Sequence, residues 1–163
     1  MRGGPFERRR GSVEVTLTEP EADLLRSVVA QMSDVLEAPG ELPYTTRLFP
    51  PAYPDDDGAQ AEFASMTAAD LIDGKRRSVA AMTRSIARGA LRRGAWRLTL
   101  TTEETDDWLA VLNDARLTLG TRLGVTEETY ERGFPEDHPD SPAYEVFRYL
   151  GWLEEHLVET LMR

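Results

Sequence analysis

The chain of 163 residues contains no cysteine. Without a thiol it cannot form a disulfide-stabilised scaffold, a thiolate metal site, a cysteine nucleophile or a thiol redox switch. It also lacks any apolar run near the ~20 residues that a membrane-spanning helix needs. The first twenty residues are basic and have no apolar segment typical of a secretory signal. We therefore expect a soluble, cytoplasmic protein that does not associate with membranes.

Histidine is scarce, and recognisable catalytic motifs are missing. The two histidines, His138 and His156, cannot form a histidine-rich metal site within one chain. The acidic run at 136–140 lacks the spacing and glycine of an EF-hand and is typical of a solvated loop. There is no glycine-rich phosphate loop and no nucleophile elbow. The sequence therefore predicts no catalytic, cofactor-binding or metal-binding residues, and an enzyme is the weakest of the functional hypotheses.

Basic residues are few, and they are unevenly distributed. The chain has one lysine and eighteen arginines against 29 acidic residues, which gives a net charge of −10. Between residues 75 and 102, however, there are eight basic residues and no acidic ones. The overall acidity argues against a protein coated in positive charge for non-specific nucleic-acid binding. It leaves room for a local basic surface on an acidic body.

Two segments resemble each other at an offset of 83 residues. Residues 13–21 (VEVTLTEPE) and 96–104 (WRLTLTTEE) each begin with the alternation of a half-buried strand. Each then reaches a threonine followed three residues later by a glutamate, the spacing of a helix capping box. Because a lone short strand leaves its backbone unpaired, we expect residues 12–17 and 96–101 to pair as a two-stranded ribbon.

Hydrophobic periodicity predicts four principal helices. They cover residues 19–37, 67–93 and 102–123, and a last helix begins at Ser141 and Pro142; a short helix is expected at 59–65. Around them we expect a flexible basic N-terminus at 1–11, an ordered proline-rich strap at 38–58 and an acidic loop at 125–141, with a possible helical turn at 127–131. The predicted fold is mainly α: one domain of residues 1–163, a helical bundle with a small two-stranded β-ribbon.

Two surfaces are candidates for binding. Arg77, Arg84, Arg88 and Arg92 fall on one side of the predicted helix 67–93, opposite its apolar stripe. Such a face could contact DNA phosphates or an acidic protein; alternatively, its arginines pair with the protein's own carboxylates. The last helix has a wide apolar face, on which Tyr144, Phe147 and Trp152 suggest a homodimer interface; burial within a single chain is the alternative.

Three blocks of sequence carry a resemblance to a known family. They are residues 47–53 (RLFPPAY), 108–123 (WLAVLNDARLTLGTRL) and 144–152 (YEVFRYLGW). They resemble an actinobacterial family known as domain of unknown function 2017 (DUF2017), and the resemblance covers nearly the whole chain. One branch of that family is described as an oxidative-stress-responsive transcriptional regulator.

The resemblance implies a cytoplasmic, non-enzymatic regulator without a cofactor. Its implied partners are an RNA polymerase sigma factor or another acidic protein, and DNA at promoters. Genes of the family tend to lie near those of a protease adaptor and of cysteine synthesis. The alternative implied function is therefore an adaptor or scaffold linked to proteolysis or sulfur metabolism, with no nucleic-acid role. The regulator's switch is assigned to an N-terminal cysteine pair, so thiol sensing does not carry over to this cysteine-free chain.

Overall fold

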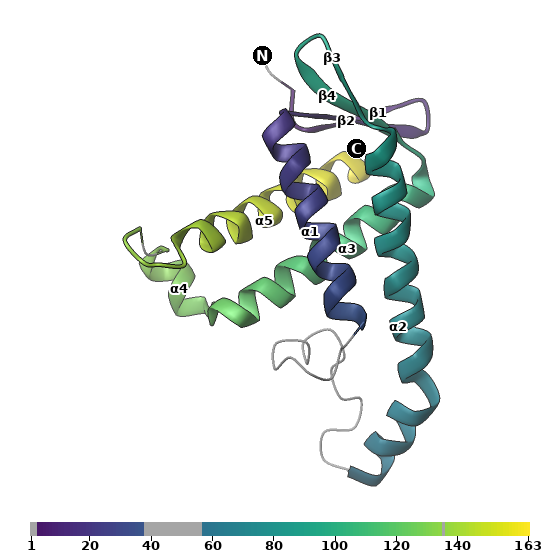
Figure 1. Cartoon of the computed structure of the whole chain (residues 1–163), viewed down its shortest axis with the longest axis vertical. Helices are drawn as coiled ribbons and strands as arrows, with labels where there is room; N and C mark the ends of the chain where they lie inside the picture. Colours follow the sequence, from purple (N-terminus) through teal and green to yellow (C-terminus); the bar gives the residue numbers. More distant parts are fainter. Residues whose placement is uncertain (1–2, 38–56, 135) are drawn as a thin grey trace.

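The computed structural model describes residues 3–37, 57–134 and 136–163, and these residues form five helices and a four-stranded antiparallel sheet (Figure 1). In chain order the elements are β1 (Phe6–Arg9), β2 (Ser12–Leu17), α1 (Glu19–Glu37), α2 (Asp57–Arg88), β3 (Ala90–Arg92), β4 (Ala95–Leu100), α3 (Thr102–Leu123), α4 (Glu127–Arg132) and α5 (Ser141–Met162). The prediction of a mainly α fold with a small β part is confirmed.

The two predicted strands pair directly. β2 and β4 are antiparallel neighbours at the centre of the sheet, with Val15 opposite Leu98 and Leu17 opposite Trp96. Val15 and Leu98 are also equivalent positions of the sequence repeat, 83 residues apart. When equivalent residues of two antiparallel strands face each other, the strands are related by a local two-fold axis. The duplication therefore generates the centre of the sheet.

Each predicted strand has a partner that the sequence analysis missed. β1 pairs with β2, and β3 pairs with β4, so the strand order is β1-β2-β4-β3. The connections are Arg10-Gly11 and Arg93-Gly94, and all four residues have positive φ, between 49° and 86°. Positive φ at both central positions is the geometry of a two-residue type I′ hairpin. Residues 6–9 are thus a paired strand, where we had expected a flexible N-terminus.

Both capping boxes predicted from the repeat are present. At the start of α1, the Glu21 amide donates to the Thr18 hydroxyl at 3.3 Å, and the Thr18 amide donates to the Glu21 carboxylate at 2.7 Å. At the start of α3, Thr101 and Glu104 exchange the same two bonds at 3.1 and 2.9 Å. Each box satisfies backbone donors that the first helical turn leaves free.

The predicted boundaries of the second long helix were wrong. α2 is one continuous helix of 32 residues from Asp57 to Arg88, so it absorbs the short helix expected at 59–65, and no helix starts at Thr67. It also stops five residues before Arg93. Gly89, just after its end, lies against the indole of Trp96: a Cβ on Gly89 would come within 2.0 Å of that ring. The next residue, Ala90, begins the β3–β4 hairpin.

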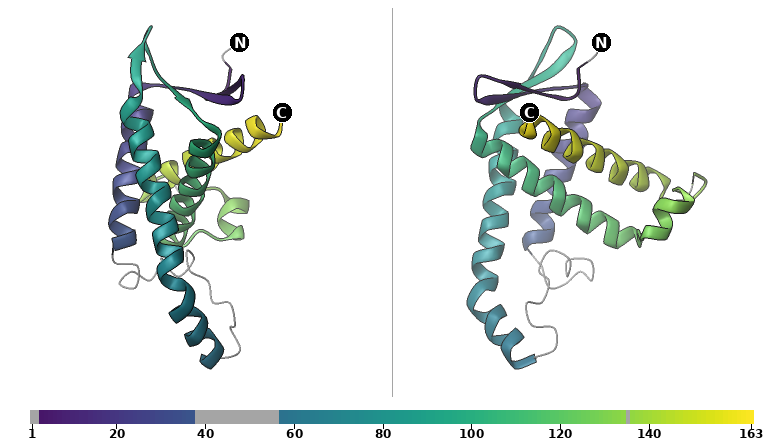
Figure 2. Two further views of the ribbon diagram at one scale, coloured as in Figure 1. Left: turned by 90° about the vertical axis from the view of Figure 1, so that its right-hand side faces the viewer. Right: turned by 180° about the vertical axis from the view of Figure 1, so that it is seen from behind.

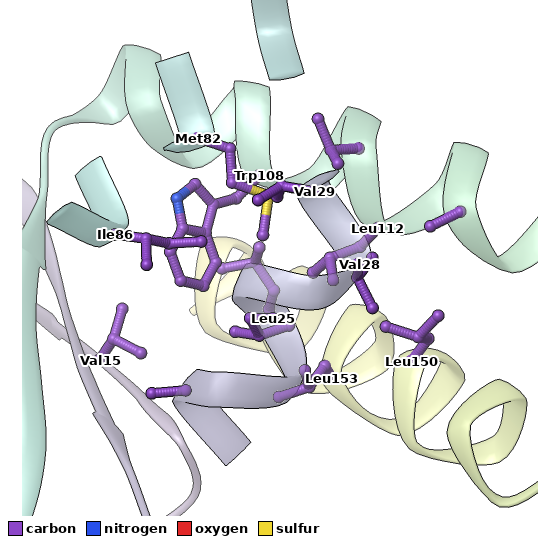
Figure 3. Close-up of a cluster of buried hydrophobic side chains, with 14 of the residues drawn as sticks. Val15, Leu25, Val28, Val29, Met82, Ile86, Trp108, Leu112, Leu150 and Leu153 are labelled. Atoms are coloured by element: carbon purple, nitrogen blue, oxygen red, sulfur yellow. The ribbon is translucent and has the colours of Figure 1, made fainter. Parts of the chain in front are cut away.

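The sheet caps one end of the helices, and its inner face contributes to the core (Figures 1 and 2). Val13, Val15, Leu17, Trp96, Leu98 and Leu100 point inward from β2 and β4 and are buried. Trp108 of α3 is fully buried at the centre, among side chains of α1, α2 and α5 (Figure 3). Its indole N–H donates to the Ser85 hydroxyl at 2.8 Å, which satisfies a polar atom that burial would otherwise leave unpaired.

α4 lies at the end of α3 away from the sheet, and α5 returns from there toward the sheet (Figure 1). α4 occupies part of the region expected to be an acidic loop, including the helical turn expected at 127–131. α5 packs along α3 and reaches β1. The proline-rich strap expected at 38–58 lies, except for its last two residues, outside the described part of the chain. Residues 57 and 58 begin α2.

Candidate functional site

The outer side of α2 carries two arginines that remain open to solvent. Arg77 and Arg84 are exposed, as the periodicity predicted, because seven residues correspond to nearly two helical turns. The sides of the helix that flank Arg77 are occupied: Ser78 donates to Asp107 of α3 at 2.9 Å, and Arg76 donates to the Leu36 carbonyl of α1 at 2.8 Å. Within the described residues, neither Arg77 nor Arg84 makes a hydrogen bond or ion pair.

Arg88 is also exposed, but it has a partner within the chain. Its two terminal nitrogens donate to the two oxygens of Glu104 at 2.6 and 2.8 Å, and one of them reaches the Thr99 carbonyl at 3.2 Å. The bonds to Glu104 raise the pKa of Arg88, and the same bonds lower the pKa of Glu104. Glu104 is also the capping glutamate of α3. For Arg88, internal pairing therefore describes the structure better than a free binding face.

Arg92 lies on a different element from the one predicted. It belongs to β3, because α2 ends at Arg88, and it is exposed on the outer face of the sheet. The same face carries Arg97 of β4, which the sequence analysis did not include among the candidates. The pairing of β3 with β4 places Arg92 and Arg97 on one face of the hairpin. Arg97 could have been identified as a candidate from the sequence only if β3 had been predicted.

These arginines surround a hollow on the outer face of the sheet. Its volume is about 410 Å³. It is lined by Glu14, Val15, Thr16, Arg88, Ala90, Arg92, Arg97, Leu98 and Thr99. We call this the sheet-face hollow. The candidate surface therefore has two parts: the α2 stripe, Arg77 and Arg84, and the sheet-face hollow, with Arg88 between them.

The three residues proposed for a dimer interface differ in exposure. Phe147 is 5% exposed and is buried within this chain, so it is not available to a second copy. The Tyr144 hydroxyl donates to the Leu123 carbonyl at 3.2 Å and fastens α5 to the end of α3. Trp152 is 41% exposed and stacks on Tyr149 at 5.8 Å. The apolar face of α5 is therefore used largely within the chain.

The sequence block most specific to the family resemblance forms contacts between helices. Asp114 pairs with Lys75 of α2 at 2.8 Å, and Arg116 pairs with Glu154 of α5 at 2.9 Å. Leu112 and Ala115, between and beside them, are in the core. These residues connect α3 to its two neighbours, so this part of the block stabilises the packing of the helices.

The described residues contain neither a cluster of metal ligands nor a membrane-spanning helix. No group of three histidine, aspartate or glutamate side chains is arranged to hold a metal ion there. In the same part of the chain, no helix has the length and apolar character needed to cross a membrane.

Comparison with known proteins places the chain in a family. The model of the family described as domain of unknown function (DUF2017) matches residues 1–161, and the chain belongs to this family. It is 35% identical over 130 residues to a protein of Mycobacterium leprae that is provisionally named oxidative stress regulator AosR. It is 30% identical over 154 residues to the oxidative stress regulator AosR of Mycobacterium bovis and of Mycobacterium tuberculosis. No solved structure matches the chain.

The relatives are longer than this protein. The matched region covers 75% of this chain and 59% of the M. leprae protein, and 86% of this chain and 67% of the other two. Their names suggest a regulatory role for the family and are consistent with a protein that is not an enzyme.

Proposed function

We propose that this protein is a non-enzymatic, cytoplasmic regulator associated with transcription, which works by contacting an acidic surface of a partner. The similarity to proteins named oxidative stress regulators supports the regulatory role. The resemblance described above makes a sigma factor the first partner to test. The α2 stripe supports the mode of action. Its two arginines, Arg77 and Arg84, are exposed and have no partner among the described residues, although the chain has a net charge of −10.

An unpaired arginine on an acidic protein is informative because surface arginines usually find nearby carboxylates. Arg88 does so with Glu104, whereas Arg77 and Arg84 have no such partner among the described residues. Contacts from guanidinium groups to carboxylates or phosphates are charge-assisted and roughly twice as strong as neutral hydrogen bonds. Reversing these charges should therefore weaken binding much more than folding.

The test is capture of purified sigma factors and promoter DNA on the immobilised full chain. The double variant Arg77→Glu/Arg84→Glu should lose the partner while keeping the wild-type melting temperature within about 2 °C, since exposed charges contribute little to stability. The matched control is Arg122→Glu, which reverses an exposed arginine near the far end of α3. Partner binding that is unaffected by the double variant contradicts the proposal.

The DNA arm of the experiment separates the proposed function from its alternative. If DNA is the partner, retention should fall steeply with salt, with a slope that counts the phosphates contacted. If the chain binds neither sigma factors nor DNA at low salt, and instead captures a protease adaptor or an enzyme of sulfur metabolism, it is an adaptor or scaffold.

A further inference from the structure

The sheet-face hollow has the composition of an anion-binding site. In an antiparallel strand alternate residues share a face. Arg92 and Ala90 of β3 therefore point outward together with Arg97 of β4. Ala90 stands directly opposite Arg97 in the register, and its small side chain leaves room between the two arginines. The hydroxyl-bearing side chains of Thr16 and Thr99 complete the polar lining.

The positive charge in the hollow is largely uncompensated. Arg92 makes no hydrogen bond or ion pair with the described residues, and Arg97 makes one long bond, to the Thr16 hydroxyl at 3.4 Å. Glu14 is the carboxylate among the lining residues, and it is already paired with Arg9 at 3.3 Å. Glu104, outside the lining, neutralises Arg88 but leaves the other two arginines with most of their donors free.

The donor groups of the hollow favour a phosphate-type anion. A guanidinium presents a planar fork of donors that matches two oxygens of a phosphate or carboxylate group. Two such forks beside threonine hydroxyls offer donors from several directions, which suits a tetrahedral oxyanion better than a planar carboxylate. The rest of the molecule is strongly acidic, so an extended polyanion laid across it would be repelled outside the hollow. A single anionic group avoids that repulsion.

We propose that the sheet-face hollow binds one phosphate-type oxyanion, with Arg92 and Arg97 as its principal ligands. This site is separate from the α2 stripe and does not depend on the regulatory role proposed above. The phosphate group can be free or can belong to a small phosphate ester such as a nucleoside monophosphate.

The experiment is a titration of the full chain, in a buffer without phosphate or sulfate, followed by amide chemical shifts. The probes are inorganic phosphate, adenosine 5′-monophosphate and a single-stranded oligonucleotide of about ten residues. Saturable shifts should appear at residues of β3 and β4, with a dissociation constant at or below about 1 mM for at least one of the first two probes. The double variant Arg92→Gln/Arg97→Gln should weaken that binding at least tenfold.

Arg77→Gln is the matched control, because it removes one exposed arginine from the α2 stripe and should change the affinity less than twofold. Three outcomes overturn the proposal. The first is that a folded wild-type chain shows no saturable binding of phosphate or of the nucleotide. The second is that Arg77→Gln loses as much affinity as the double variant. The third is that the chain binds the oligonucleotide alone. The third would indicate a surface for a nucleic-acid backbone. The proposed function is tested separately, by asking whether the Arg92→Gln/Arg97→Gln variant still captures the partner protein. If it does, the proposed function stands whether or not the hollow binds phosphate.

Discussion

At the scale of single residues, Gly89, just after the end of α2, is a position where an added side chain would clash with Trp96. Because a Cβ on Gly89 would come within 2.0 Å of the buried indole, Gly89→Ala should force the ring or the backbone to move. Overpacking of this kind costs about 1–3 kcal/mol. Chemical denaturation of the variant should show a lower free energy of unfolding by that amount.

The control is Gly74, a glycine in the interior of α2. The nearest atom to its added Cβ is the guanidinium of Arg77, at 3.8 Å. Gly74→Ala should therefore stabilise the protein by about 0.5–1 kcal/mol through the usual helical preference for alanine. Equal effects of the two substitutions would contradict the packing of Trp96 described here.

Oxidation is also a residue-scale property, because the chain has no thiol. Met162 is 83% exposed, whereas Met32 and Met82 are 3% and 0% exposed. Mild peroxide treatment should therefore convert Met162 to its sulfoxide at least tenfold faster than the two buried methionines, since oxidation needs access to the sulfur. Peptide mass spectrometry measures this ratio. The sulfoxide should persist in dithiothreitol, and diamide should produce no crosslinked species; a reducible change in mobility would be inconsistent with the sequence.

At the scale of elements, Glu104 connects the end of α2 to the start of α3. Its carboxylate caps α3 and also receives two bonds from Arg88. Glu104→Gln keeps the size and the capping capacity but removes the ion pair. We expect a loss of about 1 kcal/mol at neutral pH, within the range for a partly exposed charge-assisted contact. Glu21→Gln at the equivalent position of α1 is the control, because no arginine pairs with Glu21 among the described residues.

The pH dependence of this effect has a definite sign. Arg88 lowers the pKa of Glu104 in the folded state below its ordinary value of 4.5. The stabilisation is therefore fully present above about pH 4.5 and is lost as the pH falls through the folded-state value. The difference in stability between wild type and Glu104→Gln should shrink in acid. A difference that stays constant down to pH 2 would show that the ion pair contributes nothing.

At the scale of the whole molecule, the homodimer stays a prediction, and fewer residues now support it. Phe147 is buried and Tyr144 is bonded to the end of α3, so Trp152 is the proposed interface residue that remains available. We expect sedimentation equilibrium at tens of micromolar to show a dimer that Trp152→Arg dissociates. Tyr130→Arg, at another exposed aromatic residue, is the control. A monomeric wild type at these concentrations would refute the dimer.

The sequence by itself determined the elements whose signals are local. Alternation of apolar residues located β2 and β4, and the spacing of Thr18 with Glu21 and of Thr101 with Glu104 marked where α1 and α3 begin. These features depend on residues at most four positions apart, so neighbouring side chains suffice to specify them. The pairing of the two strands followed because the repeat made them equivalent.

Only the tertiary structure decided the features that depend on distant contacts. β1 and β3 are short, and all their residues except Phe6 are exposed; they become strands because β2 and β4 supply their hydrogen-bond partners. α2 stops at Arg88, where the chain enters the β3–β4 hairpin, and the indole of Trp96, seven residues beyond Gly89, packs against that glycine. Contacts between distant residues also divide the predicted arginine face. Arg77 and Arg84 lie on α2, and Arg88 pairs with Glu104. Arg92 lies on the sheet, where it lines the same hollow as Arg97. Helical periodicity can align side chains within one element, but it cannot say which distant carboxylate or strand will meet them.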